Sequence, residues 1–140
     1  MPLTQTPLYW QRDFPGTPAQ ARTARAFVTH LLPHHPRLDD ILLVLNELVV
    51  NAIRHTESGE PGGTFTVEIL TGDNGVAVSA ADQGGPNEPT TNPTHDLQES
   101  GRGLHMVSLT AETWTWHGNE DGRRVTAVFM NDSAPQERSI

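Results

Sequence analysis

Three polar residues recur every four positions inside an otherwise apolar stretch, at Glu47, Asn51 and His55. At about 100° per residue they fall within one narrow arc of a helix, with Arg54 beside them. A carboxylate, a carboxamide and an imidazole on one face could bind Mg²⁺, orient a water molecule and carry a proton. The alternative is the solvated face of an amphipathic helix. The amide favours a specific task, because asparagine is a poor helix former.

A second candidate is the segment Asp82, Gln83, Gly84, Gly85, Pro86, which follows a predicted strand. The chain turns through two glycines soon after the carboxylate. This arrangement would present Asp82 at the mouth of a cavity with no side chain crowding it. Taken alone, the same residues are also typical of an ordinary turn.

A third candidate is the glycine-rich segment Gly101, Arg102, Gly103, which is followed by apolar residues from Leu104 onward. Backbone amides at a helix N-terminus bind phosphate well when no Cβ atoms block the approach, and Arg102 adds positive charge. The alternative for this segment is a flexible hinge.

Hydrophobic periodicity, together with Pro and Gly, predicts the elements that position these candidates. We expect helices over residues 19–32, 38–56 and 103–112, and strands over 8–14, 64–70, 76–81, 113–117 and 125–130. Thr17 is expected to cap the first helix, with Pro18 at its first position. The turns at 72–75 and 119–122 each predict a hairpin. This order predicts an α+β fold, a two-layer sandwich with helices packed on one face of a mixed, largely antiparallel sheet.

Composition narrows the class of protein. The 140 residues carry 9 Lys and Arg against 17 Asp and Glu, a net charge of −8, which argues against direct nucleic acid binding. We expect one domain over residues 1–131 and a solvated tail over 132–140. The absence of Cys fits a reducing cytoplasm. The first ten residues show no secretory signal, and the longest apolar run, at 41–45, is far short of the ~20 residues that span a bilayer.

Taken together, the three segments have the order and approximate spacing of the nucleotide-binding boxes of one ATPase superfamily. That superfamily includes DNA gyrase, the Hsp90 chaperones, histidine kinases and the MutL repair proteins. The chain resembles it over roughly residues 10–130. It is most similar to the small bacterial members, the anti-sigma factor serine kinases and their regulatory relatives. The resemblance implies the family's Bergerat-type ATP-binding fold.

The resemblance also implies a role for each matched residue. Glu47, Asn51 and His55 look like the first box, in which Asn51 holds Mg²⁺ against the phosphates of ATP and Glu47 is the general base. Asp82 looks like the residue that accepts a hydrogen bond from the adenine amino group, with Gly84 and Gly85 shaping the turn. The members of the last box, whose backbone amides bind phosphate, would be Gly101, Arg102, Gly103 and Leu104. Residues 87–100 would form a short lid.

Two positions depart from the family's pattern. The usual second box is Asp-x-Gly-x-Gly, but position 86 is Pro, so the second glycine is shifted to Gly85. The family also tends to place a Thr early in the last strand, near the adenine. Here that strand begins Arg123, Arg124, Val125 and reaches Thr126 only afterwards. Thr126 is the candidate, and the sequence leaves open which of these residues lines the pocket.

Two functions of different classes follow from the resemblance. The first is an ATP- and Mg²⁺-dependent protein serine/threonine kinase acting on a partner protein, either an anti-anti-sigma-like acceptor or a sigma factor-like regulator. The second is a non-catalytic module that sequesters such a regulator when nucleotide is bound. A ligand-free interaction protein, in which the three segments are ordinary loops and faces, is the third alternative. The resemblance is compatible with a homodimer, and we expect a cytoplasmic protein without membrane contact.

Overall fold

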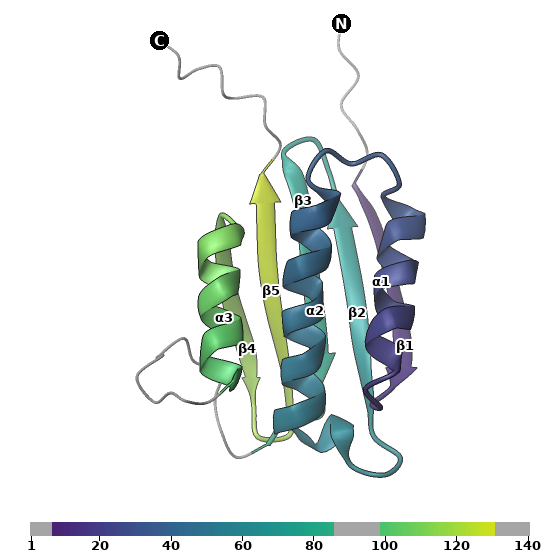
Figure 1. Cartoon of the computed structure of the whole chain (residues 1–140), viewed down its shortest axis with the longest axis vertical. Helices are drawn as coiled ribbons and strands as arrows, with labels where there is room; N and C mark the ends of the chain where they lie inside the picture. The colour runs from purple at the N-terminus through teal and green to yellow at the C-terminus, as the bar shows by residue number, and fades with distance from the viewer. Residues whose placement is uncertain (1–6, 86–98, 131–140) are drawn as a thin grey trace, which may run out of the picture.

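The computed structural model describes residues 7–85 and 99–130, and this part of the chain forms a five-stranded sheet with three α-helices (Figure 1). In chain order the elements are β1 (Leu8–Pro15), α1 (Gln20–Leu31), α2 (Leu38–His55), the short 3-10 helix η1 (Glu57–Gly59), β2 (Thr64–Thr71), β3 (Gly75–Asp82), α3 (Glu99–Thr110), β4 (Thr113–Asn119) and β5 (Gly122–Met130). The predicted tail at 132–140, Pro86 and most of the predicted lid, 87–98, lie outside the described residues.

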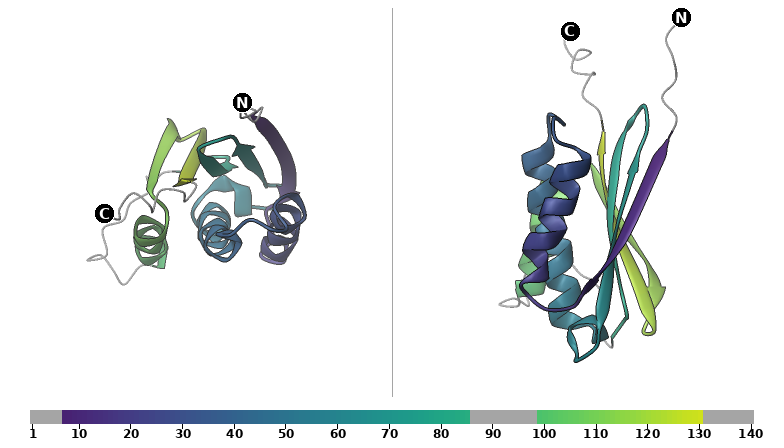
Figure 2. Two further views of the ribbon diagram at one scale, coloured as in Figure 1. Left: turned by 90° about the horizontal axis from the view of Figure 1, so that it is seen from above. Right: turned by 90° about the vertical axis from the view of Figure 1, so that its right-hand side faces the viewer.

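The strands run in the order β1-β2-β3-β5-β4, and every neighbouring pair among them is antiparallel. All three helices lie on one face of the sheet, which gives two layers (Figure 2). The predicted α+β sandwich is therefore confirmed, with a fully antiparallel sheet in the described part of the chain. Both predicted hairpins are also confirmed, because β2 pairs with β3 and β4 pairs with β5.

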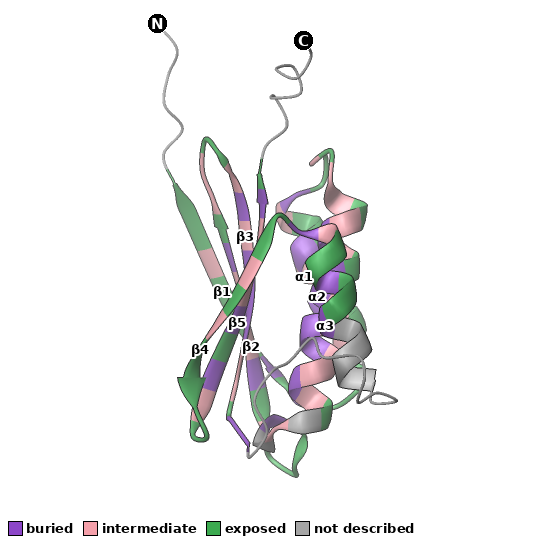
Figure 3. Ribbon diagram, turned by 90° about the vertical axis from the view of Figure 1, so that its left-hand side faces the viewer, coloured by how far each residue is buried: buried purple, intermediate pink, exposed green. Residues whose placement is uncertain are grey.

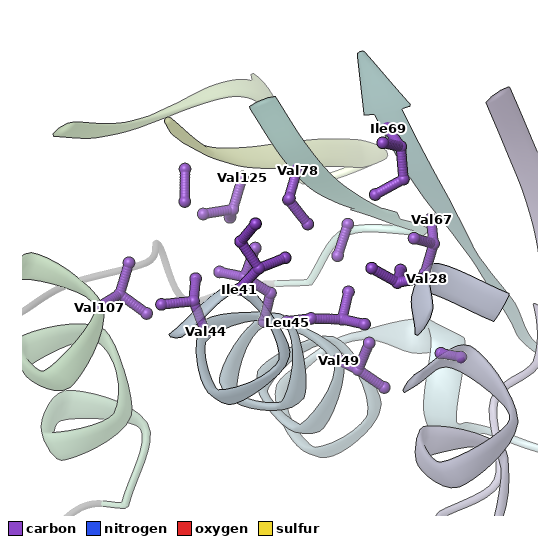
Figure 4. Close-up of a cluster of buried hydrophobic side chains, with 14 of the residues drawn as sticks. Val28, Ile41, Val44, Leu45, Val49, Val67, Ile69, Val78, Val107 and Val125 are labelled. Atoms are coloured by element: carbon purple, nitrogen blue, oxygen red, sulfur yellow. The ribbon is translucent and has the colours of Figure 1, made fainter. Parts of the chain in front are cut away.

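The core lies between the two layers, where the buried positions of the helices and of the sheet face one another (Figure 3). Along β2 the buried residues Phe65, Val67 and Ile69 alternate with more exposed ones, which is the period of a strand with one buried face. In α2, Val44 and Leu45 point toward Val78 of β3 and Val107 of α3 (Figure 4). Burial of such side chains contributes about 1.5–3 kcal/mol each, so packing of the amphipathic helices holds the sandwich together.

The face of the sheet that the helices leave uncovered carries several polar side chains near its middle. Glu68 accepts hydrogen bonds there from the hydroxyl of Tyr9 (2.6 Å) and from Nε of Arg124 (2.5 Å). Nearer the centre, the hydroxyls of Ser79 and Thr126 share a hydrogen bond of 2.8 Å. The alternation of β3 and β5 places these side chains away from the core.

Two helix starts differ from the prediction. The residue before α1 is Ala19, without a side-chain cap, and Thr17 instead offers its backbone carbonyl to the amide of Gln20. Thr17 and Pro18 form a turn before the helix. The third helix begins at Glu99, four residues before the predicted start at Gly103. Glycine in a helix is about 1 kcal/mol less favourable than alanine. The local sequence therefore does not predict a helix that includes Gly101 and Gly103 in its first turns.

Among the described residues, no helix is both long and apolar enough to cross a membrane.

Candidate functional site

The three segments that the sequence marks for chemistry gather at one end of the sandwich. The helix α2 runs toward this end, β3 finishes there and α3 starts there (Figure 1). The backbone amide of Gln83 donates to the hydroxyl of the buried Ser58, at 2.9 Å, which joins the segment after α2 to the end of β3. Residues far apart in the sequence therefore meet at a common edge.

In α2, Glu47 and Asn51 are both partly buried and lie one helical turn apart. The side-chain oxygen Oδ1 of Asn51 is buried and accepts no hydrogen bond within the described part of the chain. A buried acceptor without a partner costs about 1–3 kcal/mol. Its neighbour Asn46 differs, because its Oδ1 accepts a hydrogen bond from Arg25 of α1 at 2.7 Å. The side chain of His55 lies outside the described residues.

At the end of β3, Asp82 is partly buried and its Oδ1 accepts a hydrogen bond of 2.7 Å from the amide of Gly84. Burial raises the pKa of Asp82 above its ordinary value, while the Gly84 amide and the positive charge of Arg123 oppose that shift. By alternation Asp82 is on the helix-facing side of β3, with the buried Val78 and Ala80. The carboxylate is therefore presented on the core side of this sheet end.

The turn after Asp82 is built around its two glycines. Gly84 has φ +83°, a conformation that L-residues with a side chain rarely adopt. A Cβ atom at this position would overlap the backbone carbonyl of Glu120 in the β4–β5 turn. The carbonyl of Gly85 accepts a hydrogen bond from the guanidinium of Arg123. The predicted turn is thus packed against a neighbouring hairpin.

The third segment lies in the first turns of α3. Because α3 begins at Glu99, the backbone of Gly101, Arg102 and Gly103 is helical, whereas the sequence predicted a helix that begins only at Gly103. The first amides of any helix lack intrahelical partners and carry partial positive charge. The side chains of residues 99–103 lie outside the described residues. Leu104 is buried in the core, so its side chain anchors the helix.

Thr126 does not lie with the other candidates. Its hydroxyl is bonded to Ser79 on the uncovered face of the sheet, opposite to the side that carries Asp82. In the register of β3 and β5, the residue directly opposite Asp82 is Arg123. The sequence left open which residue of the last strand lines the pocket. In the structure, Arg123 and not Thr126 is on the helix-facing side of β5, beside Asp82.

The sequence named Arg123 only as one of four residues of the last strand that could line the pocket, and it did not single out Ser58 at all. Residues two positions apart in a strand point to the same face, so Arg123 faces inward like Val125 and Ala127. The alternating pattern of the strand could therefore have predicted its burial. No sequence pattern marks Ser58, because its role depends on a contact with residue 83.

The chain matches the family of the histidine kinase-like ATPase domain over residues 14–129, which is most of its length. It belongs to this family. Among curated proteins the chain is similar to the anti-sigma F factors of Geobacillus stearothermophilus, at 30% identity over 92 residues, and of Priestia megaterium, at 33% over 95 residues. Each alignment covers 61% of this chain and 63% of the relative. The chain thus spans less than two thirds of the length of these relatives.

Membership of an ATPase domain family implies ATP binding, and the described residues fit that ligand. The buried Oδ1 of Asn51, which has no partner in the described part of the chain, is a neutral oxygen ligand of the kind Mg²⁺ accepts when phosphates supply the negative charge. The carboxylate of Asp82 is an acceptor suited to the amino group of adenine. The two residues stand on the helix and the strand that converge at the same end of the sandwich.

Proposed function

We propose that this domain is a cytoplasmic, ATP- and Mg²⁺-dependent protein serine/threonine kinase that acts on a regulator of transcription. The observation that carries the proposal is the buried Oδ1 of Asn51, one helical turn after Glu47, which has no hydrogen-bond partner among the residues that the structure describes. It supports a metal-bound triphosphate at this helix rather than a solvated helix face. The partner would be an anti-anti-sigma-like acceptor or a sigma factor-like regulator, in line with the printed names of the anti-sigma F factors.

Each residue has a distinct part in this proposal. Asp82 accepts a hydrogen bond from the adenine amino group and thereby selects the base. Asn51 holds Mg²⁺, which when bound would neutralise charge on the phosphates. Glu47 accepts the proton of the partner's serine or threonine hydroxyl as that oxygen attacks the terminal phosphorus of ATP, whose bond to the bridging oxygen breaks so that ADP leaves. The backbone amides at the start of α3 bind phosphate.

A second function is a module that sequesters its partner when nucleotide is bound, without phosphoryl transfer. The relatives' name, anti-sigma F factor, favours this candidate, since it states opposition to a sigma factor and not catalysis. Both functions require ATP at the same site, so nucleotide binding is tested first.

Calorimetric titration with ATP in Mg²⁺ buffer tests the binding site. Asp82→Ala should weaken ATP binding by about tenfold or more, because loss of the acceptor leaves the adenine amino group unpaired at a cost of about 1–3 kcal/mol. The matched control is Asp39→Ala, which removes an exposed carboxylate from the other end of α2 and should leave the affinity unchanged. Wild-type affinity in a folded Asp82→Ala protein would overturn the assignment.

Transfer of labelled phosphate separates the two functions. Glu47→Gln should bind ATP within a few-fold of wild type, because Glu47 faces the attacking hydroxyl, while phosphoryl transfer to a candidate partner falls by about a hundredfold. Equal transfer by both proteins would remove Glu47 from the mechanism. Tight ATP binding by wild type without transfer to any partner would favour the sequestering module.

A further inference from the structure

Arg123 is a buried arginine on the core side of the sheet, where charged side chains are rare. Only 5% of its surface is exposed, and it lies directly opposite Asp82 in the register between β3 and β5. Its neighbour in the sequence, Arg124, lies on the uncovered face and pairs with Glu68. Burial of a guanidinium is costly unless it is paired and hydrogen-bonded, so its partners indicate what it does.

The guanidinium of Arg123 joins two separate turns. One terminal nitrogen, Nη2, donates to the carbonyl of Gly85, just after β3, and Nε donates to the carbonyl of Asn119 at 3.2 Å. The group also lies 5.9 Å from the centre of the Trp116 ring. The planar fork of arginine can serve two carbonyls in fixed directions, which a single ammonium cannot do.

A second contact fixes the same turn. Gly84 packs so closely on the backbone of Glu120 that no side chain would fit between them, and the amide of Gly84 donates to Oδ1 of Asp82. The direction of the Asp82 carboxylate therefore depends on a turn held from the side of the β4–β5 hairpin. Arg123 is the side chain of that hairpin that reaches this turn.

We propose that Arg123 is a positioning residue for base recognition, which holds the turn after Asp82 so that the carboxylate selects adenine over guanine. The proposal rests on the proposed ATP site. An ionised, correctly directed carboxylate accepts from the amino group of adenine and repels the carbonyl oxygen that guanine places there. In addition, the positive charge of Arg123 opposes the rise in pKa that burial imposes on Asp82, which favours the ionised form.

The two neighbouring arginines provide a matched pair of variants for titration with ATP and with GTP. Arg123→Met retains much of the side chain's length but removes the hydrogen-bonding fork and the charge. We expect the ratio of ATP affinity to GTP affinity to fall by tenfold or more. Arg124→Met, on the opposite face of the same strand, should leave the ratio within twofold of wild type. A loss of general stability would weaken both nucleotides and would not change the ratio.

Arg123→Lys keeps the protein testable if the Met variant does not fold. Lysine retains the charge, but its donors all lie on one nitrogen and cannot reach both carbonyls as the fork does, so the ratio should still fall by fivefold or more. An unchanged ratio in a folded variant at position 123 would overturn the inference. Failure of wild type to bind ATP would instead contradict the proposed function, so the two failures are distinguishable.

Discussion

A buried oxygen without a hydrogen-bond partner is hard to explain by stability alone, and within residues 7–85 and 99–130 Oδ1 of Asn51, in the second half of α2, is such an oxygen. Alanine at this position would remove the unsatisfied acceptor and favour the helix. Asn46 of the same helix has a structural use for its amide, because it accepts a hydrogen bond from Arg25. The contrast supports the proposal that the amide of Asn51 binds a ligand.

Asn51→Ala is therefore expected to keep or raise the thermal stability of the nucleotide-free protein while reducing the effect of Mg²⁺ on ATP affinity by fivefold or more. Scanning calorimetry and titrations with and without Mg²⁺ measure the two effects. Asn46→Ala is the control, and it should lose about 1 kcal/mol of stability through the broken hydrogen bond with unchanged Mg²⁺ dependence. Equal Mg²⁺ dependence in Asn51→Ala and wild type would contradict a metal role.

At the scale of an element, the turn after β3 depends on a glycine for two reasons that can be separated. Gly84 has a positive φ and also contacts the backbone of Glu120. Gly62, in the loop before β2, has nearly the same φ, +82° against +83°, but among the described residues a Cβ atom there would meet nothing within 4 Å beyond its own chain neighbours. A side chain would be strained by the positive φ at both positions, but only at Gly84 is there no space for its Cβ atom.

Gly84→Ala should therefore cost more stability than Gly62→Ala, and only Gly84→Ala should weaken ATP binding. The strain of a side chain in the left-handed region costs about 1–2 kcal/mol, and this is the whole effect expected at Gly62. At Gly84 the overlap with Glu120 must also move the turn that presents Asp82. Thermal unfolding and ATP titration of both variants measure this, and equal effects at the two positions would contradict the proposed packing role.

The helix α3 is held firmly at the end far from the candidate site. Arg37, just before α2, donates to both carboxylate oxygens of Glu112 at 2.8 and 2.9 Å and to the carbonyl of Thr110 at 2.9 Å. Glu112 in turn accepts from the backbone amide of Met130 at the end of β5. These contacts connect the C-terminal end of α3 to the helix layer through Arg37 and to the sheet through Met130. Because this end is fixed, the position of the first turn of α3 is constrained as well.

Most elements could be predicted from the sequence because their buried side chains repeat at a regular period. The apolar residues of α2 and the alternation in β2 each point to one buried face, and the glycine-containing turns indicated both hairpins. The start of α3 could not be predicted, because Gly101 and Gly103 locally disfavour a helix that tertiary packing supports. The roles of Arg123 and Ser58 depend on contacts with residues 85 and 83, which no local pattern contains.

At the scale of the whole molecule, one shared core joins the helix layer to the sheet. Leu45 is fully buried near the middle of α2, while Leu43, two residues earlier, is 42% exposed on the outer surface of the same helix. Leu45→Ala is expected to lower the free energy of unfolding by about 2–5 kcal/mol, and Leu43→Ala by less than about 1 kcal/mol.

Urea denaturation of both leucine variants measures these differences. Domains of this size have a total stability of about 5–15 kcal/mol, so the loss at Leu45 is a large part of it and should unfold both layers together. Separate unfolding transitions for the helices and the sheet, or equal losses for Leu43→Ala and Leu45→Ala, would contradict a single shared core.

The two described ends of the chain bear on how this domain can be joined to other polypeptides. The strand β1 begins, and β5 finishes, at the end of the sandwich opposite to Asp82 and the start of α3 (Figure 1). A fluorescent protein or a second domain fused before Pro7 or after Met130 is therefore attached at the end of the sandwich opposite to the candidate site. Such chimeras offer a route to reporters of nucleotide occupancy in living cells, with both fusion junctions distant from the chemistry.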